Sequence, residues 1–199
     1  MARTQAPDYE QRREAIVEVA ARLFAKRGFA QTSVSDLSAA CSMSKSLMYH
    51  YFSSKEDILY AVMASHVDQL ESEIDDATST GVDDATQFKD VIRTFMASYA
   101  GAADRQKVLL NELDNLPAGK RKIIVAKQRH IIGAMQKLIV GLYPALASDG
   151  ARARAQTMLV FGMINWTHTW MNPRGELRAA DIAEMVLDFA VPGGGAQAS

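Results

Sequence analysis

Residues 33–57 read SVSDLSAACSMSKSLMYHYFSSKED and predict two short amphipathic helices joined by a tight turn, followed directly by a third helix. Ser33 and Asp36 form a capping-box pattern, in which each side chain bonds the backbone N–H of the other, so a helix is expected to begin near Val34. Small residues on one face let such a helix cross a neighbour closely. The residues expected on that face are Val34, Leu37, Ala40 and Cys41.

The second helix is expected to begin at its cap, Ser44, after a turn at Ser42 and Met43. Met48 and Phe52 lie four residues apart and therefore point inward together. The residues expected to point outward are Ser46, Leu47, Tyr49 and His50. No acidic residue lies between Met43 and Phe52, and a short cationic, hydroxyl-rich helix braced by another helix suits the DNA major groove. We therefore expect the chain to bind double-stranded operator DNA.

A third helix is expected to follow a cap at Ser53 or Ser54, with Glu56 or Asp57 as the acidic partner. Lys55 then lies in the first turn, where a cation works against the helix dipole. This small cost is explained if Lys55 contacts a DNA phosphate. The alternative is an ordinary exposed lysine, which is also common in a first turn.

Four stretches within residues 12–59 resemble the DNA-binding domain of the TetR family of bacterial repressors. They read ARLFAKRGF at 21–29, TSV at 32–34, SK at 44–45, and YHYF at 49–52 followed by SKE at 54–56. The resemblance implies that one set of residues approaches the DNA backbone: Thr32, Ser33, Lys45, Tyr49, His50 and Lys55. It also implies that a second set lies near base edges: Ser44, Ser46 and Leu47.

The chain departs from the family pattern at three positions. Serine stands at 42, in the turn, and at 46, where the family often has glycine. A left-handed backbone at Ser42 costs about 1 kcal/mol, unless the turn relaxes to avoid it. Leu47 replaces the usual threonine or serine and favours an apolar contact with a thymine methyl group over a hydrogen bond. These differences leave the operator sequence open.

The chain has 199 residues and a formal charge of −1, which does not favour nonspecific coating of nucleic acid. Residues 1–60 hold eight Lys and Arg against seven Asp and Glu. The acids expected on the first helix, away from the recognition stretch, are Asp8, Glu10, Glu14 and Glu18. Candidates for additional phosphate contacts are Arg3, Arg12 and Arg13.

Cys41 is the only cysteine, so the chain can form neither an internal disulfide nor a multi-cysteine metal site. We expect neither a metal nor a cofactor. A free cysteine in a helix crossing acts as a small apolar filler. The N-terminus is polar, and no apolar run approaches the length that a membrane span needs. The sequence therefore predicts a cytoplasmic protein without a membrane span.

Helical periodicity without a competing strand pattern predicts an all-α fold after a polar leader. The helices expected outside residues 33–54 cover 9–26, 55–77, 84–102, 104–116, 120–143, 152–171 and 179–191. We expect a three-helix helix-turn-helix DNA-binding domain at 1–58 and a larger helical domain for ligand binding and dimerisation at 59–191. The tail at 192–199 has nothing to pack and is expected to be disordered.

Residues 158–170 are apolar on nearly every side, so this helix is expected to be buried on two sides. One side can face the core and the other a second copy of the chain, with the last helix completing a four-helix interface across a two-fold axis. A homodimer also fits a palindromic operator, because two recognition helices must span one turn of DNA, roughly 34 Å. The TetR resemblance implies the same arrangement.

Apolar residues of the second domain are candidates to line a cavity, and the alternative is that they simply fill a core. The candidate ligand-binding residues are His66, Phe95, Met96, Tyr99, Leu113, Arg129, Met135, Phe161, Trp166 and His168. A basic run is a candidate to bind anionic groups at a cavity mouth, and its alternative is a solvated helix face. This run comprises Lys120, Arg121, Lys122, Lys127, Arg129 and His130.

Residues 109–117, 165–170 and 172–175 resemble the sensor domains of regulators of fatty-acid, phenylacetate and sterol breakdown. That resemblance implies an acyl-CoA thioester as the small-molecule inducer. Free fatty acids, aromatic acids and drugs remain open. Our hypothesis for induction is a population shift, in which the ligand displaces the helix that starts at Lys55 and changes the distance between the two recognition helices.

Two other classes compete with a ligand-responsive repressor. The first is a small helical enzyme, but the four histidines have no metal-ligand spacing, and neither a glycine-rich phosphate loop nor a nucleophile elbow is present. Glu112 and Asp114 lie two apart on an expected helix and diverge, so we expect no catalysis. The second is a DNA-binding module whose second domain only dimerises. Repressors and activators dock on DNA in the same way, so docking does not separate them.

Overall fold

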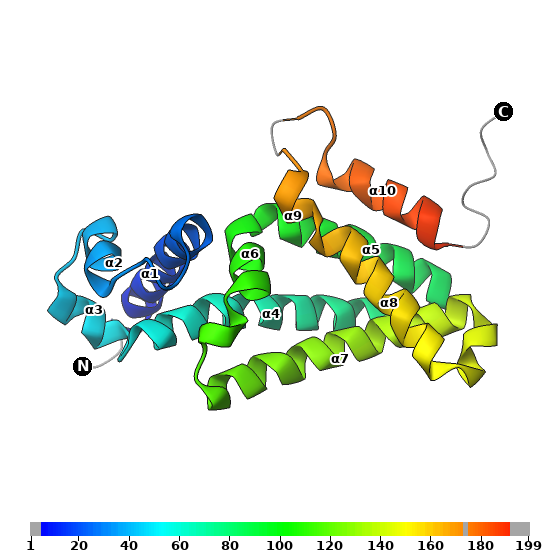
Figure 1. Cartoon of the computed structure of the whole chain (residues 1–199), viewed down its shortest axis with the longest axis horizontal. Helices are drawn as coiled ribbons and strands as arrows, with labels where there is room; N and C mark the ends of the chain where they lie inside the picture. Colours follow the sequence, from blue (N-terminus) through cyan, green and yellow to red (C-terminus); the bar gives the residue numbers. More distant parts are fainter. Residues whose placement is uncertain (1–4, 173–174, 192–199) are drawn as a thin grey trace. The chain divides into compact units, whose positions relative to one another are not determined.

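The computed structural model describes residues 5–172 and 175–191, with side chains from residue 8 onward. Every regular element in these ranges is helical (Figure 1), which confirms the predicted all-α fold. The α-helices are α1 (Gln5–Arg27), α2 (Val34–Ala40), α3 (Lys45–Tyr51), α4 (Lys55–Thr78), α5 (Asp84–Gly101), α6 (Ala103–Asn111), α7 (Ala118–Leu142), α8 (Gly150–Asn165), α9 (Thr167–Trp170) and α10 (Ala179–Ala190). Two short 3₁₀ helices are η1 (Leu113–Asn115) and η2 (Pro144–Ser148). The expected tail at 192–199, Arg3, and positions 173–174 of the stretch 172–175 lie outside the described residues.

The chain divides into two compact units. The first joins residues up to 67 with residues 104–125, and the second joins residues 68–103 with residues from 126 onward. The first unit therefore combines the predicted DNA-binding helices with α6, η1 and the first part of α7. The predicted domain boundary between residues 58 and 59 falls inside α4 and remains a prediction.

In the first unit, α1, α2 and α3 gather beside the start of α4 (Figure 1). The core includes Ile16 and Phe24 of α1, Leu37 of α2, and Met48 of α3, each of them at most 1% exposed. The predicted inward direction of Met48 is thereby confirmed. Gly28 ends α1 in the left-handed region with φ 84°, and its N–H donates to the carbonyl of Phe24, as expected of a glycine stop.

Apolar residues three and four apart in the helix expected at 84–102 predict a buried stripe, and the structure confirms it on α5 in the second unit. Its buried members are Phe88, Ile92, Phe95, Met96 and Tyr99. The last helix, α10, packs along α5 and also contacts α8. Arg93 of α5 binds the carboxylate of Glu184 of α10 through two hydrogen bonds of 2.6 and 3.1 Å, and the Tyr143 hydroxyl donates to the carbonyl of Ala190 at 2.9 Å.

Two predicted helices are shorter than expected. The helix predicted over 104–116 ends at Asn111, where the Asn111 amide donates to the carbonyl of Lys107. The helix predicted over 152–171 breaks at Trp166 into α8 and α9. The hydroxyls of Thr167 and Thr169 donate to carbonyls three residues back, and such side-chain bonds compete with the regular helical pattern.

Candidate nucleic-acid interface

The entry to α2 has the predicted capping box. The N–H of Ser33 donates to the Asp36 carboxylate at 2.8 Å, and the N–H of Asp36 donates to the Ser33 hydroxyl oxygen at 3.1 Å. Hydrogen bonds from the Ser33 hydroxyl, and then from its backbone N–H, lower the pKa of Asp36 below its ordinary value. Ser33 is itself exposed, so this cap lies at the surface where the resemblance placed a DNA contact.

The turn between α2 and α3 contains Ser42, for which the sequence left two possibilities: a strained left-handed backbone or a relaxed turn. Ser42 has φ 53° and is the only non-glycine residue with positive φ among those described, so the turn has not relaxed. The predicted packing face of α2 needs correction, because Ala40 is exposed and Cys41 is half-buried. Ser38 is buried beside Leu37 instead. Burial raises the pKa of the Cys41 thiol.

Replacing Ser42 with glycine is expected to stabilise the protein. A left-handed conformation costs a residue with a Cβ about 1–2 kcal/mol, and the greater freedom of glycine in the unfolded chain returns part of that, so we expect a net gain of about 0.5–1 kcal/mol. Urea unfolding measures the difference. The matched control is Ser46→Gly inside α3, which is expected to destabilise by about 0.5 kcal/mol. A loss of stability in Ser42→Gly would contradict the strain at this position.

The helix α3 presents most of the predicted DNA-binding residues together on an exposed surface. Its cap is Ser44, whose hydroxyl oxygen accepts the N–H of Leu47 at 3.1 Å. Leu47 is 38% exposed and Tyr49 is 51% exposed, although both side chains are large. The exposed residues contributed by α3 and its cap are Ser44, Lys45, Ser46, Leu47, Tyr49 and His50. The helix contains no acidic residue, so its surface is suited to a polyanion.

Aromatic contacts from α1 support the end of α3. The ring of Tyr9 stacks on Tyr51 with centroids 4.8 Å apart and meets the His50 ring edge-on at 6.0 Å. Sequence reasoning missed Tyr9, because its partners lie more than forty residues away and no local pattern marks it. Arg13, considered for a phosphate contact, has its guanidinium carbon 4.9 Å from the ring centre of Phe52.

Two of the nine predicted DNA-binding residues, Thr32 and Lys55, lie outside the exposed surface formed by Ser33 and α3. Thr32 is fully buried, and its hydroxyl donates to the carbonyl of Gly28 at 2.9 Å, so its side chain is not presented to DNA. The ammonium of Lys55 donates to the carbonyls of Phe29 at 2.9 Å and Thr32 at 3.0 Å. The structure therefore separates Thr32 and Lys55 from the exposed set formed by Ser33 and the residues of α3.

The predicted ligand-binding residues fall into different surroundings. His66 and Leu113 belong to the first unit, and the others belong to the second. Those buried in the second unit are Phe95, Met96, Tyr99, Met135 and Phe161. Arg129 is exposed, and Trp166 is 65% exposed. His168 is half-buried, with its Nδ1 atom 2.6 Å from the carbonyl oxygen of Asn165 in the preceding turn.

His66 forms a buried polar pair with Gln106, whose Oε1 atom lies 2.8 Å from the imidazole Nε2. Burial lowers the pKa of His66 below its ordinary value, the hydrogen bond with Gln106 acts in the opposite direction, and the charge of Arg105 lowers it further. Arg105 itself donates to Ser65 at 2.9 Å and forms ion pairs with Glu14 and Glu18. Two of the four acids of α1 that were expected to lie away from the recognition stretch, Glu14 and Glu18, thus have a partner on α6.

The neutral His66 is expected to make folding sensitive to acid. Its pKa in the folded chain lies below the ordinary value of 6.5, so its contribution to stability is complete above that pH and is lost as the pH falls through the folded value. We expect the fall in Tm between about pH 7.5 and about pH 5 to be smaller in His66→Gln than in the wild type. His50→Gln, at an exposed histidine for which the described residues provide no carboxylate partner, is the control. Equal pH dependence of His66→Gln and the wild type would contradict this expectation.

The basic face of α7 is largely neutralised by acidic partners. Its ion pairs are Lys120 with Asp57, Arg121 with Asp114, and Lys127 with Asp68 and Glu71, while the Nε2 atom of His130 lies 2.7 Å from the Asp75 carboxylate. Within residues 5–172 and 175–191, Lys122 and Arg129 form no ion pair. Two of the six basic residues in the run predicted as an anion-binding mouth, Lys122 and Arg129, therefore remain without a carboxylate partner among the described residues.

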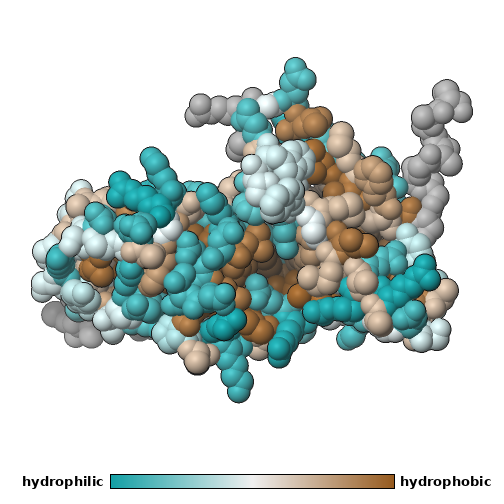
Figure 2. Space-filling view, in the orientation of Figure 1, coloured by the Kyte–Doolittle hydropathy of each residue, from teal (hydrophilic) through white to brown (hydrophobic). Residues whose placement is uncertain are grey.

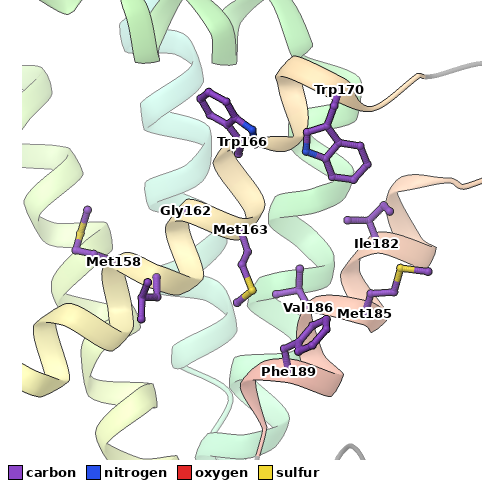
Figure 3. Close-up of a pocket in the computed structure, with 10 residues that line it drawn as sticks. Met158, Gly162, Met163, Trp166, Trp170, Ile182, Met185, Val186 and Phe189 are labelled. Carbon is purple, nitrogen blue, oxygen red and sulfur yellow. The ribbon is translucent and has the colours of Figure 1, made fainter.

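An apolar surface lies across α8, α9 and α10. It encloses a hollow of about 580 Å³. The residues lining the hollow are Met158, Leu159, Gly162, Met163, Trp166, Trp170, Ile182, Met185, Val186 and Phe189. Figure 3 shows Met163 pointing toward Val186 and Phe189, with both tryptophans at one end. Hydrophobic side chains gather where α8 and α10 lie in Figure 2. Leu159 is 69% exposed and Phe189 is 83% exposed, so the surface is uncovered in the single chain.

A capped helix-turn-helix with an exposed, acid-free second helix defines a DNA-binding protein. Comparison with known families agrees. Residues 16–62 match the family described as bacterial regulatory proteins, tetR family, and residues 81–193 match the description Tetracyclin repressor-like, C-terminal domain. The chain therefore belongs to the TetR family of bacterial transcriptional regulators.

Individual relatives span nearly the whole chain. The HTH-type transcriptional repressor KstR2 of Rhodococcus jostii (strain RHA1) is 23% identical over 187 residues, which cover 92% of this chain and 90% of the relative. A TetR-family transcriptional regulator from Bordetella parapertussis 12822 is 37% identical with a TM-score of 0.89, covering 94% of this chain and 97% of that one. The structure of AibR in complex with isovaleryl coenzyme A and operator DNA shares the fold with a TM-score of 0.81 at 24% identity, covering 91% and 98% of the two chains.

The family consists of transcriptional regulators and not of enzymes, which confirms that expectation. Within the described residues, no group of three His, Cys, Asp or Glu side chains is placed to hold a metal ion. No described helix is long and apolar enough to cross a membrane.

Proposed function

We propose that this TetR-family regulator is a repressor that binds a palindromic operator as a homodimer and is released by a hydrophobic small molecule, with an acyl-CoA thioester as the first candidate. The observation that carries the DNA-binding part is the acid-free surface of α3 with its exposed Leu47 and Tyr49. Large side chains exposed on a short helix favour a partner. Lys45, Tyr49 and His50 would approach the backbone, while Ser44, Ser46 and Leu47 would meet base edges.

Dimerisation through α8 and α10 is supported by the uncovered apolar surface around the hollow. Soluble chains rarely expose this much contiguous apolar surface without a partner. A second copy is the natural occupant, because a two-fold axis makes one apolar patch cover the same patch on its partner. It also gives the two recognition helices that a palindrome requires.

Likeness to a regulator that was solved with an acyl-CoA supports an acyl-CoA ligand, and likeness to a repressor supports repression. AibR was solved with isovaleryl coenzyme A and operator DNA, and KstR2 is described as a repressor. Within the second unit, the residues proposed for the acyl part are Phe95, Met96, Tyr99, Met135 and Phe161, and those for polar parts are Arg129 and His168. In this proposal, ligand binding shifts the population toward a state in which α4 no longer holds the two recognition helices at the operator spacing.

A second candidate ligand is a hydrophobic acid or neutral drug without CoA. The contacts along α7 favour it, because four of the six basic residues proposed for CoA phosphates already have carboxylate partners. Binding CoA there would require breaking pairs or relying on Lys122 and Arg129 alone. A ligand with one negative charge needs fewer free cations.

The test combines operator selection with a ligand screen. Duplexes that the purified protein selects from a random library supply the operator, and thermal unfolding is then followed with acyl-CoAs of graded length, phenylacetyl-CoA, free CoA and the matching free acids. A ligand at a hundred times its Kd adds about 2.7 kcal/mol, which shifts Tm by several degrees. Stabilisation and operator release by a thioester, but not by free CoA or acid, supports the first candidate. Stabilisation by free acids alone supports the second. Failure to select any duplex would overturn operator binding.

A further inference from the structure

The connector between α1 and α2 is held through the backbone groups of Gly28, Phe29 and Thr32. Lys55, at the start of α4, donates to the carbonyls of Phe29 and Thr32, and its ammonium lies 4.0 Å from the Phe29 ring centre. Thr32 closes the same connector through its hydroxyl bond to Gly28. The connector sets where α2 begins, since Ser33 follows directly as the cap of that helix.

The side chain of Glu112, which lies 83 residues after Phe29 in the sequence, also holds the connector. The Glu112 carboxylate accepts the N–H of Phe29 at 3.3 Å, and the Asn115 amide donates to its second oxygen at 2.7 Å. Glu112 lies between α6 and η1, in the segment 104–125 that belongs to the first unit. A Cβ at Gly28 would lie 3.4 Å from the Glu112 carboxylate, an ordinary van der Waals contact, so position 28 favours glycine for its positive φ and not for this approach. Phe29 is thus held at its N–H by Glu112, and at its carbonyl and ring by Lys55.

We propose that Lys55 and Glu112 are positioning residues for DNA binding: they fix the connector at 28–32, and through it α2 and the recognition helix α3, without contacting DNA themselves. Two of the three N–H donors of Lys55 are directed at carbonyls of the chain. Glu112 carries the wrong charge for a phosphate contact. Because Glu112 comes from outside the three-helix domain, the operator-binding geometry depends on segment 104–125.

The competing role for Lys55 is a direct phosphate contact, and salt separates the two roles. A lysine that neutralises a phosphate contributes roughly 0.9 to the slope of log K against log salt concentration, or about 1.8 for both copies in a dimer. A lysine that only positions the connector changes the fraction of protein in the binding geometry, which lowers the affinity at every salt concentration by the same factor.

The test measures operator affinity at several salt concentrations for the full-length wild type, Lys55→Gln and Lys45→Gln. It rests on the proposed operator binding, which the wild-type titration establishes first and independently of the variants. We expect Lys55→Gln to bind about tenfold more weakly with an unchanged slope, because it loses charge-assisted hydrogen bonds within the protein. Lys45→Gln, at the exposed start of α3, is expected to lower the slope by the phosphate-contact amount. A drop of that size in Lys55→Gln would overturn its positioning role.

Glu112 has a control two residues away. Removing an acid from a DNA-binding unit should strengthen DNA binding slightly by charge alone, whereas loss of the connector contact should weaken it. We expect Glu112→Ala to bind several-fold more weakly, Glu112→Gln to keep most of the affinity through its amide oxygen, and Asp114→Ala to bind at least as tightly as the wild type. Asp114 has a side chain that is 86% exposed and pairs with Arg121. Affinity of Glu112→Ala equal to or above the wild type would overturn its role.

Discussion

Phe189→Asp is expected to convert the protein into a monomer that no longer holds its operator. Phe189 is 83% exposed on α10 and lines the apolar hollow with Val186. In a dimer formed through this surface, the new carboxylate would be buried against apolar side chains, at a cost of several kcal/mol. Losing the link between two half-sites then lowers operator affinity by about 10²–10⁴-fold. Light scattering measures the oligomeric state, and titration of labelled operator measures the affinity.

The control for this substitution is Val82→Asp. Val82 is 45% exposed in the loop before α5 and does not line the hollow, so the same carboxylate there should leave both readouts unchanged. A dimeric Phe189→Asp protein that still binds operator tightly would show that the copies associate elsewhere.

Phe95→Ala is expected to give the largest loss of folding stability. Phe95 is fully buried on α5, with its ring centroid 6.0 Å from that of Tyr99. If this stripe is packed core, truncation leaves a cavity and costs about 3–5 kcal/mol. For a chain of this size, the loss should lower Tm by roughly 10 °C. Urea unfolding and thermal unfolding both measure it.

The same substitution distinguishes core from ligand cavity. Leu177→Ala, at a side chain that is 47% exposed, is the control and should cost less than about 1 kcal/mol. A loss equally small in Phe95→Ala, together with a changed response to ligand, would mean that the ring borders an open cavity.

Features encoded locally were predictable. The cap at Ser33, the inward direction of Met48 and the stripe of α5 each depend on residues within one or two helical turns, and the structure confirms them. The strain at Ser42 was also suspected from the sequence, because the family that it resembles often has glycine at this position of the turn.

Features that depend on distant partners were not predictable. The positions of Lys55 and Glu112 are decided by backbone groups of Phe29, which lie 26 and 83 residues away. Thr32 looked like a surface hydroxyl because its burial comes from packing of the connector. The break at Trp166 was missed because the apolar pattern continues through it, while the competing bonds come from small polar side chains.

The two tryptophans at the hollow between α8 and α10 also provide an intrinsic fluorescence probe. Both tryptophans of the chain line the hollow, with Trp166 65% and Trp170 54% exposed in the single copy. Indole emission moves to shorter wavelength when the ring leaves water. All the tryptophan fluorescence of the unmodified protein therefore originates at the proposed contact between copies, and its emission wavelength on serial dilution reads out their dissociation without any label.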